Sequence, residues 1–138
     1  MSLVVKGISS EYEVIADLIK QGYTPSIPAL PTSPYDIIAE KAGAMYKIQV
    51  KSSVFEGNKI SVHTRKSNGN KDERRYTTQE IDIIAIHDRE GKRTAYIPNE
   101  GLTKLTIYSE LPKSRNGYRK DDVIRVFDEC REIGQASA

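Results

Sequence analysis

Residues 34–54 read PYDIIAEKAGAMYKIQVKSSV, and the fold prediction starts from this stretch. Tyr35–Glu40 and Met45–Val54 are rich in β-branched and aromatic residues, which is typical of strands. The two runs are joined across Lys41-Ala42-Gly43. They are therefore predicted to form a hairpin.

The second strand of this hairpin is predicted to have a core face and a charged face, because side chains alternate along a strand. The apolar set is Tyr46, Ile48 and Val50, and the polar set is Lys47, Gln49 and Lys51. Gln49 and Lys51 stand two residues apart, so both can face the same cleft as an acidic side chain on the paired strand.

Asp36 is such an acidic side chain. It stands among apolar strand residues, where aspartate is disfavoured and is costly to bury without a partner. Two partners are considered, a bound metal ion and a salt bridge to Lys51.

A helix is predicted over residues 10–21. Ser10 and Glu13 form a capping-box pattern, apolar residues follow at helical spacing, and Gly22 supplies a stop. Glu11 then shares the inward, apolar stripe of the helix, an odd place for a lone carboxylate. The alternative is an ordinary acidic residue of the first turn, partly exposed and favoured by the helix dipole.

The rest of the chain predicts more sheet and a closing helix. Further strands are expected at Lys59–Thr64, Ile81–Ile86, Thr94–Ile97 and Leu105–Tyr108. Pro25–Pro34 is expected to be a stiff connector, and Asn68-Gly69 to turn a projecting basic β-ribbon. The closing helix is expected to start at Asp121 or Asp122 and to bury Val123, Val126, Phe127, Cys130 and Ile133.

The composition is that of one globular domain, taken as residues 1–138, with 38% hydrophobic and 29% charged residues. No apolar run approaches the roughly 18 residues of a membrane span, and the first residues turn polar too early for a signal peptide, so a cytoplasmic location is expected. A single cysteine and two distant histidines exclude a disulfide framework and a multi-cysteine zinc site. Any metal must therefore be held by oxygen.

Basic residues gather in two segments. Lys59–Arg75 and Lys113–Lys120 each carry a formal charge of +4, which leaves −6 on the rest of a chain whose total is +2. This asymmetry points to a polyanionic partner.

Each basic segment surrounds an Asn-Gly pair and is predicted to form a projecting turn. A two-stranded ribbon fits the major groove of DNA, where Arg or Lys can read guanine and Asn can read adenine. The alternative is a pair of solvated loops whose charge serves solubility only. The residues expected to contact duplex DNA are Lys59, His63, Arg65, Lys66, Asn68, Lys71, Arg74, Arg75, Lys113, Arg115, Asn116, Tyr118, Arg119 and Lys120.

Together the polar side chains suggest a site for a hard cation. An oxygen of Asp36, one from Glu11 or Gln49, and a nearby backbone carbonyl would suit Mg²⁺, which keeps several waters and accepts phosphate oxygens. Lys51 could then orient the attacking water and offset charge that grows on the phosphate in the transition state.

The pattern resembles the PD-(D/E)XK nuclease superfamily, which has the restriction-enzyme fold. The resemblance depends on three features: Tyr35-Asp36, the tripeptide Gln49-Val50-Lys51 that begins thirteen residues after the aspartate, and Glu11 in the preceding helix. Gly7–Ser53 is similar to two branches, the archaeal Holliday-junction resolvases and the bacterial intron-encoded homing endonucleases. The short chain, the glutamine and the basic segments look most like the homing enzymes of cyanobacterial group I introns.

The resemblance implies a restriction-endonuclease-like α/β (α+β) core with a mixed central sheet flanked by helices. It implies that Asp36 binds the metal, that Lys51 is the catalytic lysine, and that Glu11 is the helix-borne carboxylate. Gln49 replaces the second acidic residue of the family, so either Glu11 restores the missing charge or the site binds Mg²⁺ more weakly. Tyr35 stands where the family has its proline, which does no chemistry.

The expected function is that of a site-specific endonuclease of the intron homing type, which hydrolyses double-stranded DNA with Mg²⁺. The alternatives are a junction resolvase of the same fold and a non-catalytic nucleic-acid-binding module in which Asp36 and Lys51 only form a salt bridge. One active site cuts one strand, so a homo-oligomer is expected, a dimer or a dimer of dimers. The closing helix could supply that contact or simply close the core.

Overall fold

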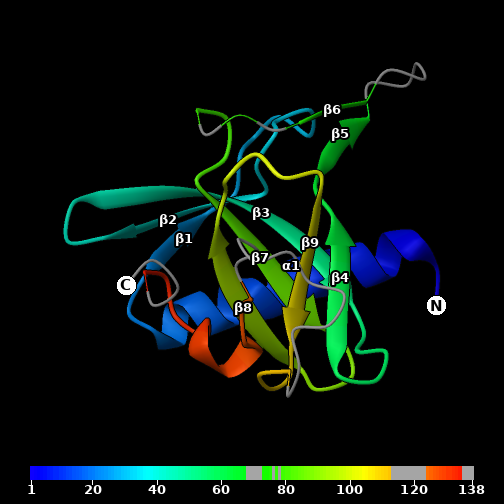
Figure 1. Ribbon diagram of the computed structural model, residues 1–138. Coiled ribbons are helices and arrows are strands. Elements are labelled where there is room, and N and C mark those ends of the chain that lie inside the picture. Colours follow the sequence, from blue (N-terminus) through cyan, green and yellow to red (C-terminus); the bar gives the residue numbers. More distant parts are fainter. Residues whose placement is uncertain (68–72, 76, 78, 113–123, 135–138) are drawn as a thin grey trace.

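The computed structural model describes residues 1–67, 73–75, 77, 79–112 and 124–134 (Figure 1). Its elements are α1 (Leu3–Lys20), β1 (Thr24–Ser26), β2 (Ile37–Lys41), β3 (Ala44–Ser53), β4 (Lys59–His63), β5 (Arg65–Ser67), β6 (Glu73–Arg75), β7 (Ile83–Asp88), β8 (Arg93–Pro98), β9 (Lys104–Tyr108) and the short 3₁₀ helix η1 (Phe127–Glu129). Of the helices in these ranges, none is both long and apolar enough to cross a membrane.

The central sheet has the strand order β1-β2-β3-β7-β8. Only the β3–β7 pair in it is parallel, so the sheet is mixed, as expected. Helix α1 packs on one face, and the two-stranded β4–β9 sheet covers the other (Figure 1).

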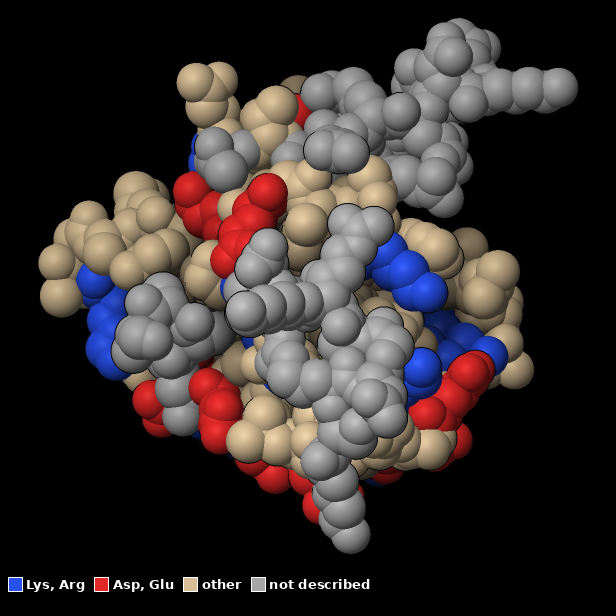
Figure 2. Space-filling model, in the orientation of Figure 1, with Lys and Arg blue, Asp and Glu red and all other residues tan. Residues whose placement is uncertain are grey.

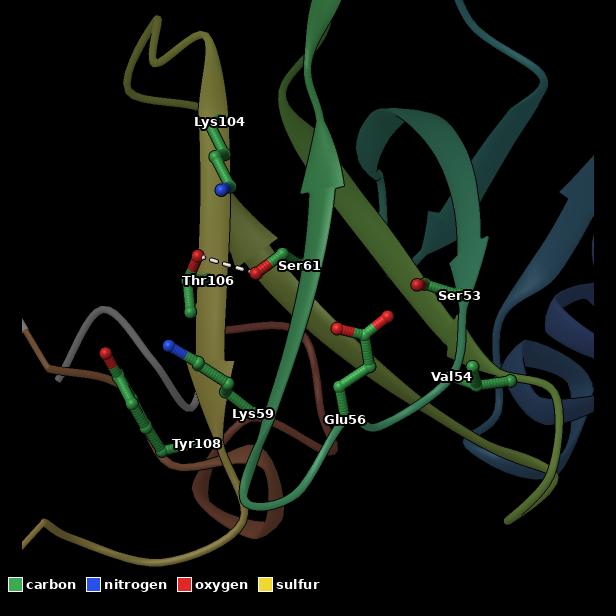
Figure 3. A pocket seen from close by; sticks show the side chains of 8 residues that line it. All are labelled: Ser53, Val54, Glu56, Lys59, Ser61, Lys104, Thr106 and Tyr108. Atoms are coloured by element: carbon green, nitrogen blue, oxygen red, sulfur yellow. Dashed lines mark hydrogen bonds between the residues drawn. The ribbon is translucent and has the colours of Figure 1, made fainter.

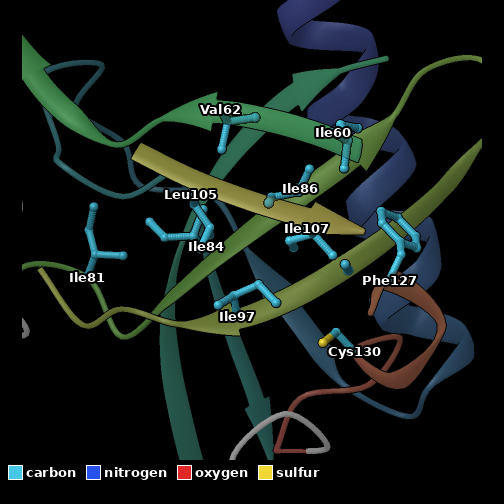
Figure 4. Close-up of a cluster of buried hydrophobic side chains, with 11 residues drawn as sticks. Ile60, Val62, Ile81, Ile84, Ile86, Ile97, Leu105, Ile107, Phe127 and Cys130 are labelled. Atoms are coloured by element: carbon cyan, nitrogen blue, oxygen red, sulfur yellow. The ribbon is translucent and has the colours of Figure 1, made fainter. Parts of the chain in front are cut away.

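Alternation along the strands divides the core between these two faces. On β7, Ile83 and Ala85 join the cluster under α1, which contains Val14 and Leu18 of the helix. Ile84 and Ile86 instead join the cluster between the sheets (Figure 4). The second cluster also contains Ile60, Val62, Ile81, Ala95, Ile97, Leu105, Ile107, Phe127 and Cys130.

The predicted hairpin is present as β2 and β3. Lys41 pairs with Ala44, and the two residues between them, Ala42 and Gly43, have φ angles of 52° and 85°. Two consecutive positive φ angles belong to the tight hairpin turns whose twist matches the strands. The preceding Pro-rich stretch is not only a connector, because Pro25 lies in edge strand β1, where its missing N–H costs little.

Helix α1 begins earlier than predicted. Ser2 is the N-cap, and its hydroxyl accepts a hydrogen bond from the Val5 N–H at 3.2 Å. Ser10 is buried in the middle of the helix, so the capping box was wrong. The predicted end is correct, because the helix stops at Lys20 and Gly22 follows with φ 91°.

The predicted closing helix is wrong within residues 124–134. Val126 is extended, and helical structure is limited to η1. The backbone of this segment bonds to strands instead, because the Tyr108 N–H donates to the Arg125 carbonyl and the Tyr96 N–H donates to the Cys130 carbonyl. Phe127 and Cys130 are nevertheless buried, as predicted. Residues 121–123 lie outside the described ranges.

The remaining strand predictions are confirmed with small shifts at the ends. The strand expected at Lys59–Thr64 is β4, and the three others are β7, β8 and β9. Strands β5 and β6 pair antiparallel and project from the core as a ribbon (Figure 1). The Asn68-Gly69 turn and the second basic segment, Lys113–Lys120, fall outside the described residues.

Candidate active site

Asp36 directly precedes β2 and is fastened to β3. Its N–H donates to the Ile48 carbonyl at 2.8 Å, and its Oδ2 accepts the Val50 N–H at 2.8 Å. Val50 is the middle residue of Gln49-Val50-Lys51, so this bond places the carboxylate beside the segment with which the sequence analysis paired it.

Glu11 reaches the same place from α1. Val14 and Leu18, both 0% exposed, fix the helix on the sheet, and Glu11 is half-buried on their side of it. The pKa of Glu11 is raised to about 7, chiefly by burial and in addition by the charge of Asp36 and a hydrogen bond shared with Asp36. The inward placement predicted for Glu11 is therefore correct.

Asp36 has a raised pKa as well. Burial is the main cause, and it is opposed by the Val50 N–H, by the hydrogen bond with Glu11 and by the charge of Lys51. Two carboxyls that share a hydrogen bond in a desolvated place hold a proton between them more readily than either would alone. Near neutral pH this pair attracts positive charge.

Lys51 lies on the polar face of β3, half-buried, with Gln49 two residues before it on the same face. Ile48 and Val50 are buried on the opposite face, as the alternation predicted. Burial lowers the pKa of Lys51, and the charge of Asp36 opposes that shift. Among the ion pairs of the described residues, none joins Lys51 to Asp36, although the charge of each acts on the pKa of the other.

The donor set fits a hard divalent cation. Glu11 and Asp36 offer carboxylate oxygens that lie close together and attract positive charge. In the part of the chain that the structure describes, no group of three or more His, Cys, Asp or Glu residues lies together, so further oxygen must come from an amide, a backbone carbonyl or water. Gln49 is the amide side chain that the sequence analysis assigned to this role, and it lies on β3 two residues before Lys51.

A polar hollow of about 370 Å³ lies beside the C-terminal end of β3, at Ser53 (Figure 3). It is lined by Ser53, Val54, Glu56, Lys59, Ser61, Lys104, Thr106 and Tyr108. Ser53 follows Lys51 by two residues on β3, so the hollow begins next to the lysine. Basic side chains gather over the β4–β9 sheet in the space-filling view (Figure 2).

The outer face of the β4–β9 sheet holds two of the predicted DNA contacts. Lys59 and His63 are exposed on β4, and His63 pairs in register with Lys104 of β9, which is also exposed. Sequence reasoning missed Lys104 because it lies outside both basic segments. The signal available was the alternation of Lys104–Tyr108, with leucine and isoleucine between polar residues.

Other predicted DNA contacts are placed only in part. Arg65, Lys66, Arg74 and Arg75 belong to the β5–β6 ribbon, in which Arg65 pairs with Arg75 and Lys66 pairs with Arg74. The remaining ones fall outside the described residues: Asn68, Lys71, Lys113, Arg115, Asn116, Tyr118, Arg119 and Lys120.

Comparison with known proteins agrees with this architecture. No curated protein matches the chain. The fold is similar to the solved structure of a bacterial homing endonuclease, I-Ssp6803I, with a TM-score of 0.71 at 21% sequence identity, over 83% of this chain and 84% of the other. The family model described as PD-(D/E)XK endonuclease matches residues 1–131. The chain therefore belongs to the PD-(D/E)XK endonuclease family.

Proposed function

We propose that the chain is a Mg²⁺-dependent, site-specific endonuclease that hydrolyses phosphodiester bonds in double-stranded DNA. The observation that carries the proposal is the convergence of three elements on one point. Asp36 is held at β3 by the Val50 N–H, Glu11 of α1 shares a hydrogen bond with it, and Lys51 is half-buried beside them. Membership of a nuclease family supports it.

The proposed metal site uses Asp36, Glu11 and the Gln49 amide oxygen. A bound divalent ion would polarise the phosphate and make water more acidic. The shared proton of the two carboxyls must leave before both can hold a cation, so Glu11 is the group whose deprotonation permits binding near neutral pH. Glu11 supplies the negative charge that Gln49 lacks.

Lys51 is proposed to act on the nucleophile and the phosphate. Its amine donates hydrogen bonds, so it can orient the attacking water and offset the charge that develops on the phosphate oxygens. Burial strengthens such interactions, because the local dielectric is lower than in water. The charge of Asp36 opposes the effect of burial on the pKa of Lys51 and so favours the protonated form of the lysine.

Duplex DNA is proposed to lie across the β4–β9 face and the β5–β6 ribbon. Lys59, His63 and Lys104 offer contacts for phosphates next to the hollow at Ser53. The antiparallel ribbon is of a kind that enters the major groove, where arginine reads guanine. A polar surface for phosphates and a projecting element for bases match the requirements of a sequence-specific cutter.

The intron homing role and a homo-oligomeric state complete the proposal. Fold similarity to a homing endonuclease supports the former. The latter follows from the reaction, because one active site cleaves one strand and a duplex has two strands related by symmetry. We expect a dimer or a dimer of dimers.

The test uses three substrates in Mg²⁺ buffer: genomic-length duplex DNA, a library of randomised duplexes, and a synthetic four-way junction. Discrete duplex fragments that disappear with EDTA support the proposal. Cutting of the junction alone would identify a resolvase of the same fold. Binding of DNA without cleavage of any substrate would identify a non-catalytic module.

A further inference from the structure

Helix α1 carries a second apolar stripe that the core does not use. Its buried face holds Ser10, Val14 and Leu18. Away from that face stand Val4, Val5, Ile8, Tyr12 and Ile19, exposed by 69%, 47%, 49%, 61% and 57%. Val4, Ile8, Tyr12 and Ile19 recur at the spacing of one helix face. An exposed apolar stripe of this length is typical of an interaction surface.

The middle of the stripe is hollowed. Ile8, Ser9, Tyr12, Glu13 and Ala16 line a shallow depression of about 380 Å³ on the outer side of the helix. The small side chains of Ser9 and Ala16 leave room between the larger ones. This is the groove that side chains of another helix fill when two helices pack together.

The charges beside the stripe indicate what covers it. Lys6 and Glu13 are seven residues apart, two turns along one side of the helix, and Glu13 lines the depression. When two copies of α1 pack antiparallel about a twofold axis near Ser9 and Ser10, Lys6 lies opposite Glu13 of the partner subunit and Glu13 lies opposite the partner's Lys6. In the same register Ile8 meets the partner's Tyr12. Such self-complementarity is the property of an interface between identical chains.

We propose that the outer face of α1 is the dimer interface of this protein, and that a second copy of the chain, packed antiparallel, occupies it. Among the ion pairs of the described residues, none includes Lys6 or Glu13, although the charge of Glu13 does act on His87 of β7. Leu30 and Met45, which are also strongly exposed, belong to segments outside α1.

The arrangement has a consequence for the two active sites. In an antiparallel pair about a twofold axis, the same edge of both helices lies on the same side of the dimer. Glu11 is on the edge opposite Lys6 and Glu13, so both copies of Glu11 lie on one side. Two sites on one side can reach the two strands of one duplex. This consequence rests on the proposed nuclease function, whereas the interface does not.

The experiment measures oligomeric state by size-exclusion chromatography with light scattering and fold by circular dichroism. Ile8→Glu and Tyr12→Glu should turn a dimer into a folded monomer, or raise the dissociation constant roughly tenfold or more. Leu30→Glu, at a more exposed apolar position outside α1, is the control and should keep the oligomeric state of the wild type. Monomeric wild-type protein, or α1 variants that keep the oligomeric state of the wild type, would overturn the proposal.

A charge swap tests the register. Lys6→Glu and Glu13→Lys should each weaken the dimer, and the double variant should restore it. Single variants without effect, or a double variant weaker than both, would overturn the antiparallel register. Under the proposed function, monomeric Ile8→Glu should still nick duplex DNA but lose coordinated double-strand cutting. If the wild type dimerises through α1 and cuts no DNA, the interface stands and the nuclease proposal fails.

Discussion

Two aspartates flank β3, and they make almost the same contacts. Asp36 directly precedes β2 on one side, and Asp82 directly precedes β7 on the other. Each carboxylate accepts a backbone N–H of β3, Asp36 from Val50 at 2.8 Å and Asp82 from Lys47 at 2.7 Å. Each backbone N–H also donates to a β3 carbonyl. Both residues fasten a neighbouring strand to β3.

The difference lies in what else reaches each carboxylate. Asp36 shares a hydrogen bond with Glu11 and faces the charge of Lys51, and burial raises its pKa. At Asp82 the further contact is with the backbone: the N–H of Asn99, which follows β8, donates to the Asp82 carbonyl. The anchor itself is therefore a structural device. The proposed active site is the anchor at which a second carboxylate and an amine also lie close to the aspartate.

The largest expected effect is a difference in cleavage rate between variants of the two aspartates. Asp36→Asn should lower the cleavage rate on the order of 10³-fold or more, because it removes a charge from the proposed metal site while the amide oxygen can still accept the Val50 N–H. Asp82→Asn makes the same change at the matched position and should retain cleavage. Single-turnover assays on the cognate duplex give the comparison, and equal losses in the two variants would show that the role of Asp36 is structural.

The lysines of β3 provide the next comparison. Lys51→Met should reduce turnover about 10²–10³-fold with little change in DNA affinity, because it removes a donor aimed at the reacting phosphate. Lys47 lies on the same polar face of β3, four residues before Lys51, and Lys47→Met should cleave normally. Cleavage rates and binding isotherms are measured for both. Loss of affinity and turnover together in Lys51→Met would instead favour a binding module.

The carboxyl pair should destabilise the fold at high pH. The folded pKa of Glu11, about 7, lies above the unfolded value of 4.5, so its contribution to stability is fully present below pH 4.5 and is lost as the pH rises through 7. Glu11→Gln removes this loss. Glu11 is partly exposed, and solvent screening limits the gain at pH 8 to ~1 kcal/mol, or about 2–4 °C in Tm.

Thermal unfolding in EDTA at pH 8 and pH 4 measures this difference. At pH 4 the variant and the wild type should unfold at nearly the same temperature, because Glu11 is protonated in both the folded and unfolded states for most molecules. A variant that is less stable than the wild type at pH 8 would show that the Glu11 carboxylate stabilises the fold.

The smallest expected effect concerns the hollow beside the site. Lys104→Ala should weaken DNA binding a few-fold. The slope of log K against the logarithm of the salt concentration should fall by about one, as expected for the loss of one phosphate contact. Lys20→Ala, an exposed lysine in the last turn of α1, is the control. Binding isotherms at several salt concentrations distinguish them. An unchanged slope for Lys104→Ala would remove the β4–β9 face from the DNA interface.

Local patterns explain what the sequence analysis predicted well. The β2–β3 hairpin, the two faces of β3 and the inward position of Glu11 each depend on a period of two or of 3.6 residues within one short segment. These three features predict that Asp36, Lys51 and Glu11 lie together, and in the structure their charges act on one another.

Non-local contacts explain what it missed. Ser10 and Glu13 have the same spacing inside a helix as at its start, and only the cap at Ser2 distinguishes the two. Val126, Phe127 and Cys130 follow a helical spacing, but the backbone of this segment bonds to distant strands and its helical structure is limited to η1. The role of Asp82 and the position of Lys104 depend on the β3–β7 and β4–β9 pairings, which no local pattern predicts. The DNA contacts and metal ligation stay predictions.

The most direct test of the central claim is thermal unfolding of wild type, Asp36→Asn and Asp82→Asn in rising Mn²⁺ or Mg²⁺ at pH 8, which requires no knowledge of the target DNA. A ligand that binds only the folded state raises Tm. Wild type and Asp82→Asn should be stabilised alike by the metal, and Asp36→Asn should not respond. A response of Asp36→Asn equal to that of the wild type, or a response lost only in Asp82→Asn, would contradict the assignment of the metal site.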